Sequence, residues 1–295
     1  MRIGIAGLGR MGTAMAERLM EVGHALTVWN RSPGKVKPLV EAGATAASGP
    51  ADLVRGTDAI ITIVTDAKAL DAVYRGPSGL LAGDCEGKLF IEMSTVQPET
   101  EVALAEDVRA RGAAFIECPV GGTTGPARTG KLIGLAGGEA ADVERARAIL
   151  DQLCRRVEHV GPVGAGASMK LAINLPLLVY WQALGEAYAL CRHLGLDRAA
   201  MMDLFADTSG GPNVLKVRGP AVAKALSGMD PGPATFDVDS IRKDLRMMIA
   251  EGKARGVALP LVERTLAVYD EASAAGWGAR DSASVPAFWS SRDRR

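Results

Sequence analysis

The chain has 295 residues, enough for two domains with sizeable cores, and 48% of them are hydrophobic, which is typical of a globular protein. Its 34 Lys and Arg residues balance 34 Asp and Glu residues, and the short tail at 292–295 is the one basic cluster, so no nucleic-acid or membrane partner is expected. The four cysteines form no Cys-x-x-Cys pair and the three histidines do not cluster with them, so we expect no metal site and a reducing compartment. The sequence shows neither a signal peptide nor a membrane-length apolar run, and a cytoplasmic location is therefore expected.

A glycine-rich turn follows the first predicted strand. The strand is the apolar run at 3–6, and apolar residues at helical spacing from 14 to 20 predict a helix after the turn. The glycines allow a tight turn and a close approach to a pyrophosphate, whose charge the helix N-terminus favours. Gly-x-Gly-x-x-Gly alone is a weak signal, but its place between strand and helix predicts a dinucleotide site. The expected cofactor contacts are Gly7, Leu8, Gly9, Arg10, Met11 and Gly12.

The second predicted strand, at 25–29, ends in Asn30, Arg31 and Ser32. Folds that bind NAD usually have an acidic residue here to hold the ribose hydroxyls, and such a residue would repel a 2′-phosphate. Arg31 can instead bind that phosphate with two hydrogen bonds, and Ser32 can add a hydroxyl. We therefore predict NADP(H) rather than NAD(H) as the cofactor. The alternative is that Arg31 is an ordinary surface arginine or stacks on the adenine.

Two further apolar strands, at 58–64 and 88–93, are each followed by a plausible helix. Strands alternating with helices predict a doubly wound parallel sheet, with the ligand at the carboxyl ends of the strands. Polar loops follow both strands. Val64 and Thr65 are expected to contact the cofactor, and Ser94 and Thr95 the substrate. The alternative for Ser94 or Thr95 is to cap the helix that begins near Pro98.

A strand at 113–120 runs into a loop rich in glycine. Backbone N–H groups at Gly121 and Gly122 could bind a carboxylate, although a flexible connection to the strand at 132–136 is the alternative. A helix at 141–153 and a strand at 156–160 follow. The turn at 161–164 closes the first predicted domain, which spans residues 1–163.

One long apolar helix is predicted from 166 to 193, with a kink at Pro176. Lys170 and Asn174 share a face of this helix, which should be largely buried. A buried lysine is uncommon unless it is paired or used in chemistry, and burial should lower its pKa; the alternative is that its amine reaches water from a helix end. Helices are expected at 198–206, with Asp197 as cap, at 236–255 and at 261–275, and no strand follows. The second predicted domain, residues 164–295, is therefore all-helical.

These motifs, in order, resemble those of the β-hydroxyacid dehydrogenases. This group includes 3-hydroxyisobutyrate dehydrogenase and glyoxylate/succinic semialdehyde reductase, and it is related to 6-phosphogluconate dehydrogenase. The resemblance covers almost the whole chain and implies a Rossmann domain followed by an all-α domain, joined by the long helix. It rests on the segments 7–16, 30–32, 92–95, 117–122, 164–174, 243–245 and 281–283.

The resemblance implies a role for each site residue. Lys170 donates a proton to a carbonyl oxygen while NADPH delivers a hydride to the carbon, and Asn174 orients the substrate or the lysine. Thr95 and the backbone amides of Gly121 and Gly122 hold the substrate carboxylate. Lys243 borders the nicotinamide and the substrate, and Thr95 is expected to contact the cofactor as well. Two positions differ from the family pattern, because Gly121 replaces a serine and Ile173 replaces the first asparagine of a pair.

The sequence thus predicts an NADPH-dependent oxidoreductase that interconverts a β-hydroxyacid and its semialdehyde or keto form. The wider pocket implied by Gly121 supports an alternative, a reductase of a bulkier or non-carboxylate carbonyl compound. An imine reductase shares the architecture, but those enzymes generally lack a lysine at this position. A non-catalytic NADP(H)-binding protein is an alternative of another class. The apolar helices predict a homodimer or homotetramer packed through the helical domain.

Overall fold

The structure is a computed structural model, and it describes residues 1–292. Residues 293–295, most of the basic tail and the end of the second predicted domain, lie outside the described residues. The chain forms two compact units, Met1–Leu171 and Ala172–Arg295. The division falls inside the long helix, whereas the sequence places the boundary in the turn before it. Each unit is described by itself below.

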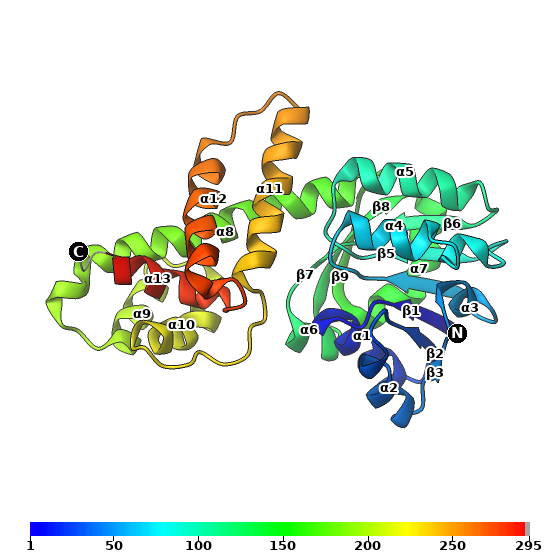
Figure 1. Cartoon of the computed structure of the whole chain (residues 1–295), viewed down its shortest axis with the longest axis horizontal. Coiled ribbons are helices and arrows are strands. Elements are labelled where there is room, and N and C mark those ends of the chain that lie inside the picture. Colours follow the sequence, from blue (N-terminus) through cyan, green and yellow to red (C-terminus); the bar gives the residue numbers. More distant parts are fainter. Residues whose placement is uncertain (293–295) are drawn as a thin grey trace. The chain divides into compact units, whose positions relative to one another are not determined.

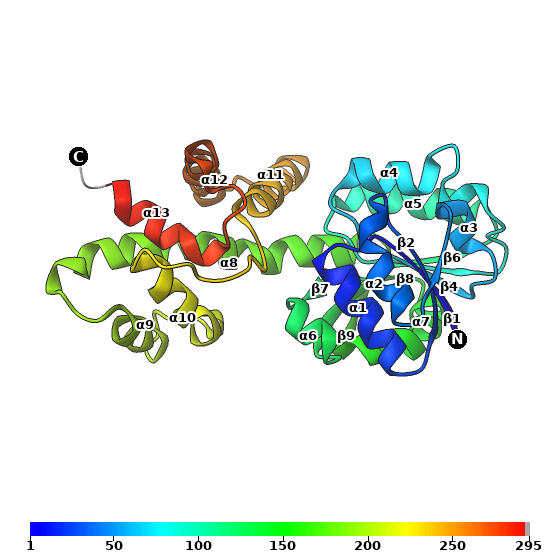
Figure 2. The ribbon, with the colours of Figure 1, turned by 60° about the horizontal axis from the view of Figure 1, so that its bottom comes forward.

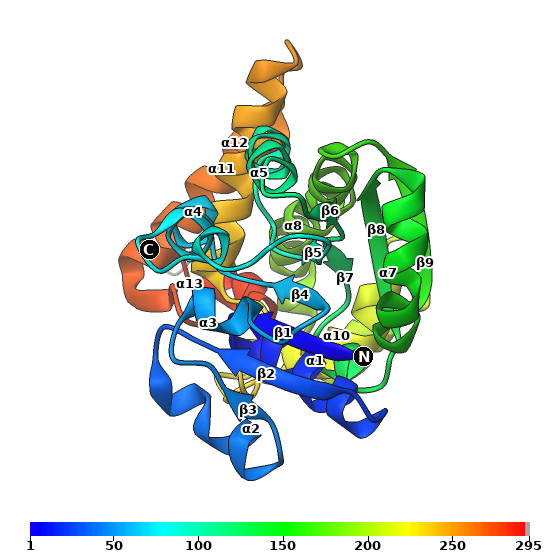
Figure 3. The same ribbon diagram turned by 90° about the vertical axis from the view of Figure 1, so that its right-hand side faces the viewer.

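The first unit is built on a nine-stranded sheet with the order β3-β2-β1-β4-β5-β6-β8-β7, and β9 pairs with β8 (Figure 3). From β3 to β6 all strands are parallel, so the expected doubly wound sheet is confirmed. The strands are β1 (Arg2–Ala6), β2 (Ala25–Trp29), β3 (Thr45–Ala46), β4 (Ala59–Thr62), β5 (Leu89–Glu92), β6 (Ala114–Glu117), β7 (Val120–Gly121), β8 (Leu132–Gly138) and β9 (Cys154–Gly161). The helices of this unit are α1 (Arg10–Glu21), α2 (Lys37–Glu41), α3 (Pro50–Val54), α4 (Ala67–Arg75), α5 (Pro98–Arg109), α6 (Thr124–Arg128) and α7 (Ala140–Leu153).

Helices cover both faces of this sheet (Figure 2). Neighbouring residues of a central strand point to opposite faces, so Ile61 joins the core beneath α1 and α7, while Ile60 joins the core beneath α4 and α5. Ile91 and Phe90 divide in the same way. Strands buried on both faces read as continuous apolar runs, which is why they could be recognised in the sequence.

One edge of the sheet departs from the parallel pattern. β8 runs antiparallel to both β6 and β7, and then β9 pairs with β8 in parallel. The glycine-rich segment between β6 and β8 therefore forms a short strand and the helix α6 rather than a flexible connection. The segment 122–131 that joins β7 to β8 is shorter than the dozen or more residues that a parallel crossover needs, in agreement with the antiparallel pairing of these two strands.

The second unit is helical, as the sequence predicts (Figure 1). Asp197 caps α9 by accepting a hydrogen bond from the Ala200 backbone N–H at 2.9 Å. After β9 the described part of the chain forms no further strand, although an isolated bridge joins Asp237 to Asp281. The sequence interpretation missed α10, which has Gly219 and Pro220 in its middle, and the short α13. The helices are α8 (Ala165–Cys191), α9 (Arg198–Ala206), α10 (Asn213–Leu226), α11 (Val238–Ala254), α12 (Pro260–Ala272) and α13 (Val285–Arg292).

Helix α8 runs through Pro176 without a break and begins in the first unit. The expectation that it is largely buried is wrong. Leu178, Trp181 and Leu184 are buried, but Leu190 is 79% exposed. An apolar helix that buries only one stripe leaves its other apolar residues at the surface. Among residues 1–292, no helix combines the length and the apolar character that a membrane crossing requires.

Candidate active site

The glycine turn after β1 is tightly packed at two of its three glycines. Gly7 has φ +102°, and a Cβ on it would overlap the Ile63 carbonyl oxygen. A Cβ on Gly12 would overlap the Gly7 carbonyl oxygen, which lies under the first turn of α1. Both glycines are therefore required by the protein itself: Gly7 by its left-handed backbone and by the close contact, and Gly12 by the close contact alone.

Gly9 is different, because a Cβ on it would have no protein atom within 4 Å. Its backbone φ is −68°, which any residue adopts, and it stands at the N-cap of α1 without a side-chain cap. The open side of Gly9 and the N–H groups that begin α1 form a cradle that fits a pyrophosphate. The residues present therefore fit a dinucleotide cofactor.

Asn30 connects this turn to the end of β2. Its Oδ1 accepts a hydrogen bond from the Leu8 N–H at 2.9 Å, and its Nδ2 donates to the Ser32 carbonyl at 3.0 Å. Arg31 and Ser32 themselves are exposed. The side chain of Asn30 thus holds the glycine turn in place, while Arg31 and Ser32 are available at the surface beside it.

The loops that follow β4 and β5 are joined by a serine. Ser94 is 2% exposed, and its hydroxyl accepts a hydrogen bond from the Val64 N–H at 2.8 Å. Thr65, in the first loop, is exposed, and Thr95, next to Ser94, is half-buried. The N-cap of α5 is Gln97, so the alternative that Ser94 or Thr95 caps this helix is wrong.

Gly121 and Gly122 differ in the space around them. Gly121 belongs to β7, and a Cβ on it would lie 3.8 Å from the Cβ of Ile133, an ordinary contact distance. Gly122 has φ +122°, and a Cβ there would lie 2.8 Å from a methyl group of Leu132. The backbone requires glycine at 122, whereas nothing in the fold prevents a side chain at 121.

Helix α8 is tied to the sheet through Glu117, the last residue of β6. The Glu117 carboxylate accepts hydrogen bonds from the backbone N–H groups of Gly164, Gly166 and Ala167, at 2.5, 2.9 and 3.1 Å. Lys170 follows one turn later in the same unit and is half-buried. The first turn of α8 is therefore held at the carboxyl end of the parallel strands, the same edge at which the glycine turn lies.

The second unit holds Asn174 and Lys243 around a buried carboxylate. Asn174 Nδ2 donates to Asp244 Oδ2 at 3.3 Å, and Lys243 Nζ lies 3.1 Å from Asp244 Oδ1. Asp244 is 2% exposed. The sequence interpretation named Lys243 and gave Asp244 no role. The position of this carboxylate, next to a lysine in an amphipathic helix, could have indicated an ion pair.

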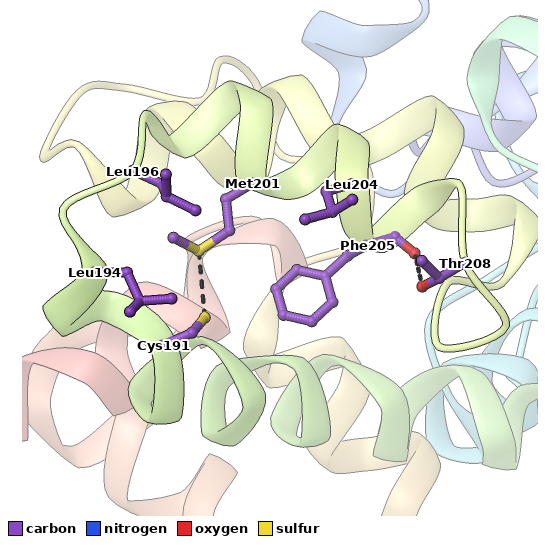
Figure 4. A pocket seen from close by; sticks show the side chains of 7 residues that line it. All are labelled: Cys191, Leu194, Leu196, Met201, Leu204, Phe205 and Thr208. Carbon is purple, nitrogen blue, oxygen red and sulfur yellow. Dashed lines mark hydrogen bonds between the residues drawn. The ribbon is translucent and has the colours of Figure 1, made fainter.

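An apolar pocket lies at the end of α8 in the second unit (Figure 4). Its polar atoms bond within the pocket: Cys191 Sγ contacts Met201 Sδ at 3.4 Å, and the Thr208 hydroxyl donates to the Phe205 carbonyl at 3.0 Å. It offers no charged group for a cofactor or a carboxylate, so we do not count it as a catalytic site. The pocket is lined by Cys191, Leu194, Leu196, Met201, Leu204, Phe205 and Thr208.

Two family models match nearly the whole chain. The NAD binding domain of 6-phosphogluconate dehydrogenase matches residues 2–161, and the NAD-binding domain of NADP-dependent 3-hydroxyisobutyrate dehydrogenase matches residues 164–288. Together with the fold, these matches define an NAD(P)-dependent oxidoreductase that acts on CH–OH groups. The chain belongs to the β-hydroxyacid dehydrogenase family.

Individual relatives agree with this placement. The chain is 33% identical over 285 residues to glyoxylate/succinic semialdehyde reductase 1 of Arabidopsis thaliana, covering 97% of each chain. It is 34% identical over 283 residues to 3-sulfolactaldehyde reductase of Escherichia coli, covering 96% of this chain and 94% of that one. Among solved structures, 3-hydroxyisobutyrate dehydrogenase from Salmonella typhimurium superposes with a TM-score of 0.87 at 25% identity, covering 97% and 99% of the two chains.

Proposed function

We propose that the protein is an NADPH-dependent reductase of a small semialdehyde or keto acid. In the opposite direction it catalyses the oxidation of the corresponding β-hydroxyacid. The observation that carries the proposal is the Glu117 carboxylate on the first turn of α8, because it fixes the lysine-bearing helix at the ligand edge of the nucleotide-binding sheet. The names of the relatives, which include a semialdehyde reductase and a sulfolactaldehyde reductase, support the substrate class.

In this mechanism NADPH supplies a hydride to the carbonyl carbon when it is bound. Lys170 donates a proton to the carbonyl oxygen, which yields the alcohol, and it takes the proton back in the oxidation. Thr95 and the backbone N–H groups of Gly121 and Gly122 hold the substrate carboxylate. Ser94 supports that loop through its bond from Val64, and by resemblance Asn174 orients the reacting groups and Lys243 borders the nicotinamide.

The second candidate function is the reduction of a bulkier or non-carboxylate carbonyl compound. It is favoured by the open space at Gly121, where the family has a serine that hydrogen-bonds the carboxylate. A panel of small aldehydes with and without a carboxylate, assayed by NADPH oxidation, tests both candidates. Turnover of aldehydes that lack a carboxylate, with none of glyoxylate or succinic semialdehyde, would establish the second. No turnover of any aldehyde, ketone or imine would instead support a non-catalytic NADP(H)-binding protein.

Substitution of Gly121 by serine should restore the missing donor. A Cβ at this position meets no atom closer than 3.8 Å, so the side chain fits without a shift of β7. One hydrogen bond to a charged group is worth about 1.5–3 kcal/mol, and we expect kcat/KM for carboxylate aldehydes to rise about tenfold or more. Gly125→Ser is the matched control, because a Cβ there is also unobstructed. An equal rise for aldehydes without a carboxylate would contradict this reading of the loop.

Arg31 is proposed to select NADPH over NADH. The arginine is exposed at the end of β2, next to the turn that Asn30 holds. Arg31→Gln removes a charged donor pair, so the KM for NADPH should rise about tenfold or more while the KM for NADH changes little. Arg55→Gln removes an exposed arginine elsewhere and serves as the control. An equal rise of the KM values for NADPH and NADH would show that Arg31 contacts the adenine instead.

We also propose assembly through the second unit, as a homodimer or homotetramer. Exposed apolar side chains support this proposal: Leu190 is 79% exposed, Val217 78% and Leu204 61%. Surfaces of this kind in several helices of one unit commonly mark a protein interface. Sedimentation or light scattering at micromolar concentration measures the assembly directly, and a monomer would refute it. The cytoplasmic location stays a prediction.

A further inference from the structure

The first turn of α8 lacks a cap of its own. A helix leaves its first backbone N–H groups without intrahelical partners, and a side chain at the N-cap usually accepts from one of them. Here the residue before α8 is Gly164, which has φ +97° and no side chain. Glu117, 47 residues earlier in the chain, supplies the acceptors instead, for Gly164 and for two N–H groups of the first turn.

The glycines around this carboxylate leave no room for movement. A Cβ on Gly166 would overlap the Leu135 carbonyl oxygen and would lie 3.2 Å from the Glu117 carboxyl carbon. A Cβ on Gly137, in β8, would overlap Glu117 Oε1. The carboxylate therefore lies in a slot between β8 and α8 that fits it closely, and the helix start is located by Glu117 on one side and by the β8 backbone on the other.

The slot is an unfavourable place for a negative charge. Glu117 is fully buried, and the side chains of Glu92, on β5, and Glu101, on α5, are also fully buried nearby. Burial, with a smaller contribution from Glu92, raises the pKa of Glu117 to about 7 in spite of the three N–H bonds that lower it. Burial and then Glu92 raise the pKa of Glu101 well above its ordinary value. Burial also raises the pKa of the Cys118 thiol, next to Glu117 in the chain, well above its ordinary value.

We propose that Glu117 is a positioning residue for Lys170: it locates the start of α8 and so sets where the amine meets the substrate carbonyl. The inference rests on the proposed function, since it takes Lys170 as the proton donor. Lys170 follows Ala167, the last of the bonded residues, by three positions in the helix. A displacement of the helix start therefore moves the amine directly, and a misplacement of about 1 Å can cost a reaction about a hundredfold.

Glu117→Gln tests the proposal at nearly constant size. The amide keeps one oxygen acceptor but presents an N–H₂ group toward a backbone N–H, so the helix start must shift. We expect kcat to fall at least tenfold, with the affinity for NADPH unchanged within twofold. Glu101→Gln is the matched control: it also replaces a fully buried carboxyl group by an amide, but at a residue that bonds to none of the three α8 N–H groups that Glu117 holds. We expect it to keep kcat within threefold.

The stability of Glu117→Gln distinguishes a positioning role of Glu117 from a purely structural one. An acid whose folded pKa is raised binds its proton more tightly when folded, so stability falls as pH rises from about 4.5, the ordinary value, to about 7. At pH 8 the amide removes this cost of ionisation, which offsets part of the lost hydrogen bonding. We expect the midpoint of thermal unfolding of Glu117→Gln at pH 8 to stay within a few degrees of wild type. Wild-type kcat in this variant would overturn the proposal.

A second variant covers the case in which Glu117→Gln does not fold. Gly166→Ala displaces the start of α8 from the β8 backbone without changing any charge, and we expect the same loss of kcat with NADPH affinity retained. If Gly166→Ala folds and turns over like wild type, the helix start does not set the position of Lys170 and the proposal fails.

A readout independent of turnover distinguishes this inference from the proposed function. Reductive methylation with ¹³C-formaldehyde labels lysine amines, and the signal missing in Lys170→Arg identifies Lys170. We expect this signal to shift in Glu117→Gln and to stay in place in Glu101→Gln. A shifted signal in a protein that reduces no carbonyl compound would support positioning and refute the function, whereas an unmoved signal would refute positioning alone.

Discussion

Replacing Lys170 with alanine is expected to lower kcat/KM for carbonyl reduction by about 10³–10⁴-fold while leaving NADPH affinity within twofold of wild type. General acid catalysis by a positioned side chain is worth about 10²–10⁴-fold, and the loss of the ammonium charge near the developing alkoxide adds to it. The glycine turn that fits the cofactor has its own hydrogen bonds, from Leu8 to Asn30 and from Gly7 to Trp29, and neither involves the lysine. Steady-state kinetics and NADPH fluorescence titration measure the two effects separately.

Two further lysine variants define what is lost. Lys170→Arg keeps a positive charge but has a pKa above about 12, so it donates a proton poorly at neutral pH; it should stay at least a hundredfold below wild type. Lys253→Ala removes an exposed lysine near the end of α11 and should turn over normally. Full activity of Lys170→Arg would show that the residue supplies charge rather than a proton, and full activity of Lys170→Ala would refute the mechanism.

The sequence predicted those parts of the fold that local patterns specify. Apolar runs with glycine or polar ends gave the parallel strands, and Asp197 was recognised as a cap because its partner, Ala200, lies three residues away. The exposed stripe of α8 was misjudged, since an apolar helix at the surface of one chain and an apolar helix in its core have similar compositions. Leu190 and Trp181 are both large apolar residues of the same apolar helix, but Trp181 is buried and Leu190 is exposed, and the sequence does not show this difference.

The candidate site was predictable as a set of motifs but not as a set of contacts. The family pattern named Ser94, and the structure shows that its hydroxyl accepts from Val64, 30 residues earlier. Asp244 and Glu117 both stood inside recognised motifs, yet their partners, Asn174 and the first turn of α8, lie 70 and 47–50 residues away. Tertiary hydrogen bonds of this span leave no periodic trace, so the sequence showed the residue types and not their roles.

The three glycines of the glycine turn also have roles that the sequence motif does not distinguish. Gly7 and Gly12 are required by packing inside the protein, whereas Gly9 leaves room for the cofactor. A Cβ on Gly12 would overlap the Gly7 carbonyl oxygen, and backbone on both sides cannot yield, so Gly12→Ala should lower stability by about 1–3 kcal/mol and abolish NADPH binding. A Cβ on Gly9 meets no protein atom within 4 Å. Gly9→Ala should therefore unfold at the wild-type temperature and yet bind NADPH at least tenfold more weakly.

The pair separates folding from binding within one motif. Gly49→Ala is the control for adding a methyl group to an open N-cap glycine, since its Cβ is also unobstructed and its backbone is extended. Calorimetry measures the stability of the three variants, and titration measures their affinity for NADPH. Gly49→Ala should match wild type in both quantities, Gly9→Ala should lose only NADPH affinity, and Gly12→Ala should lose both stability and affinity. If Gly9→Ala binds NADPH with wild-type affinity, the pyrophosphate does not approach the backbone there, and the cofactor must lie elsewhere on the carboxyl edge of the sheet.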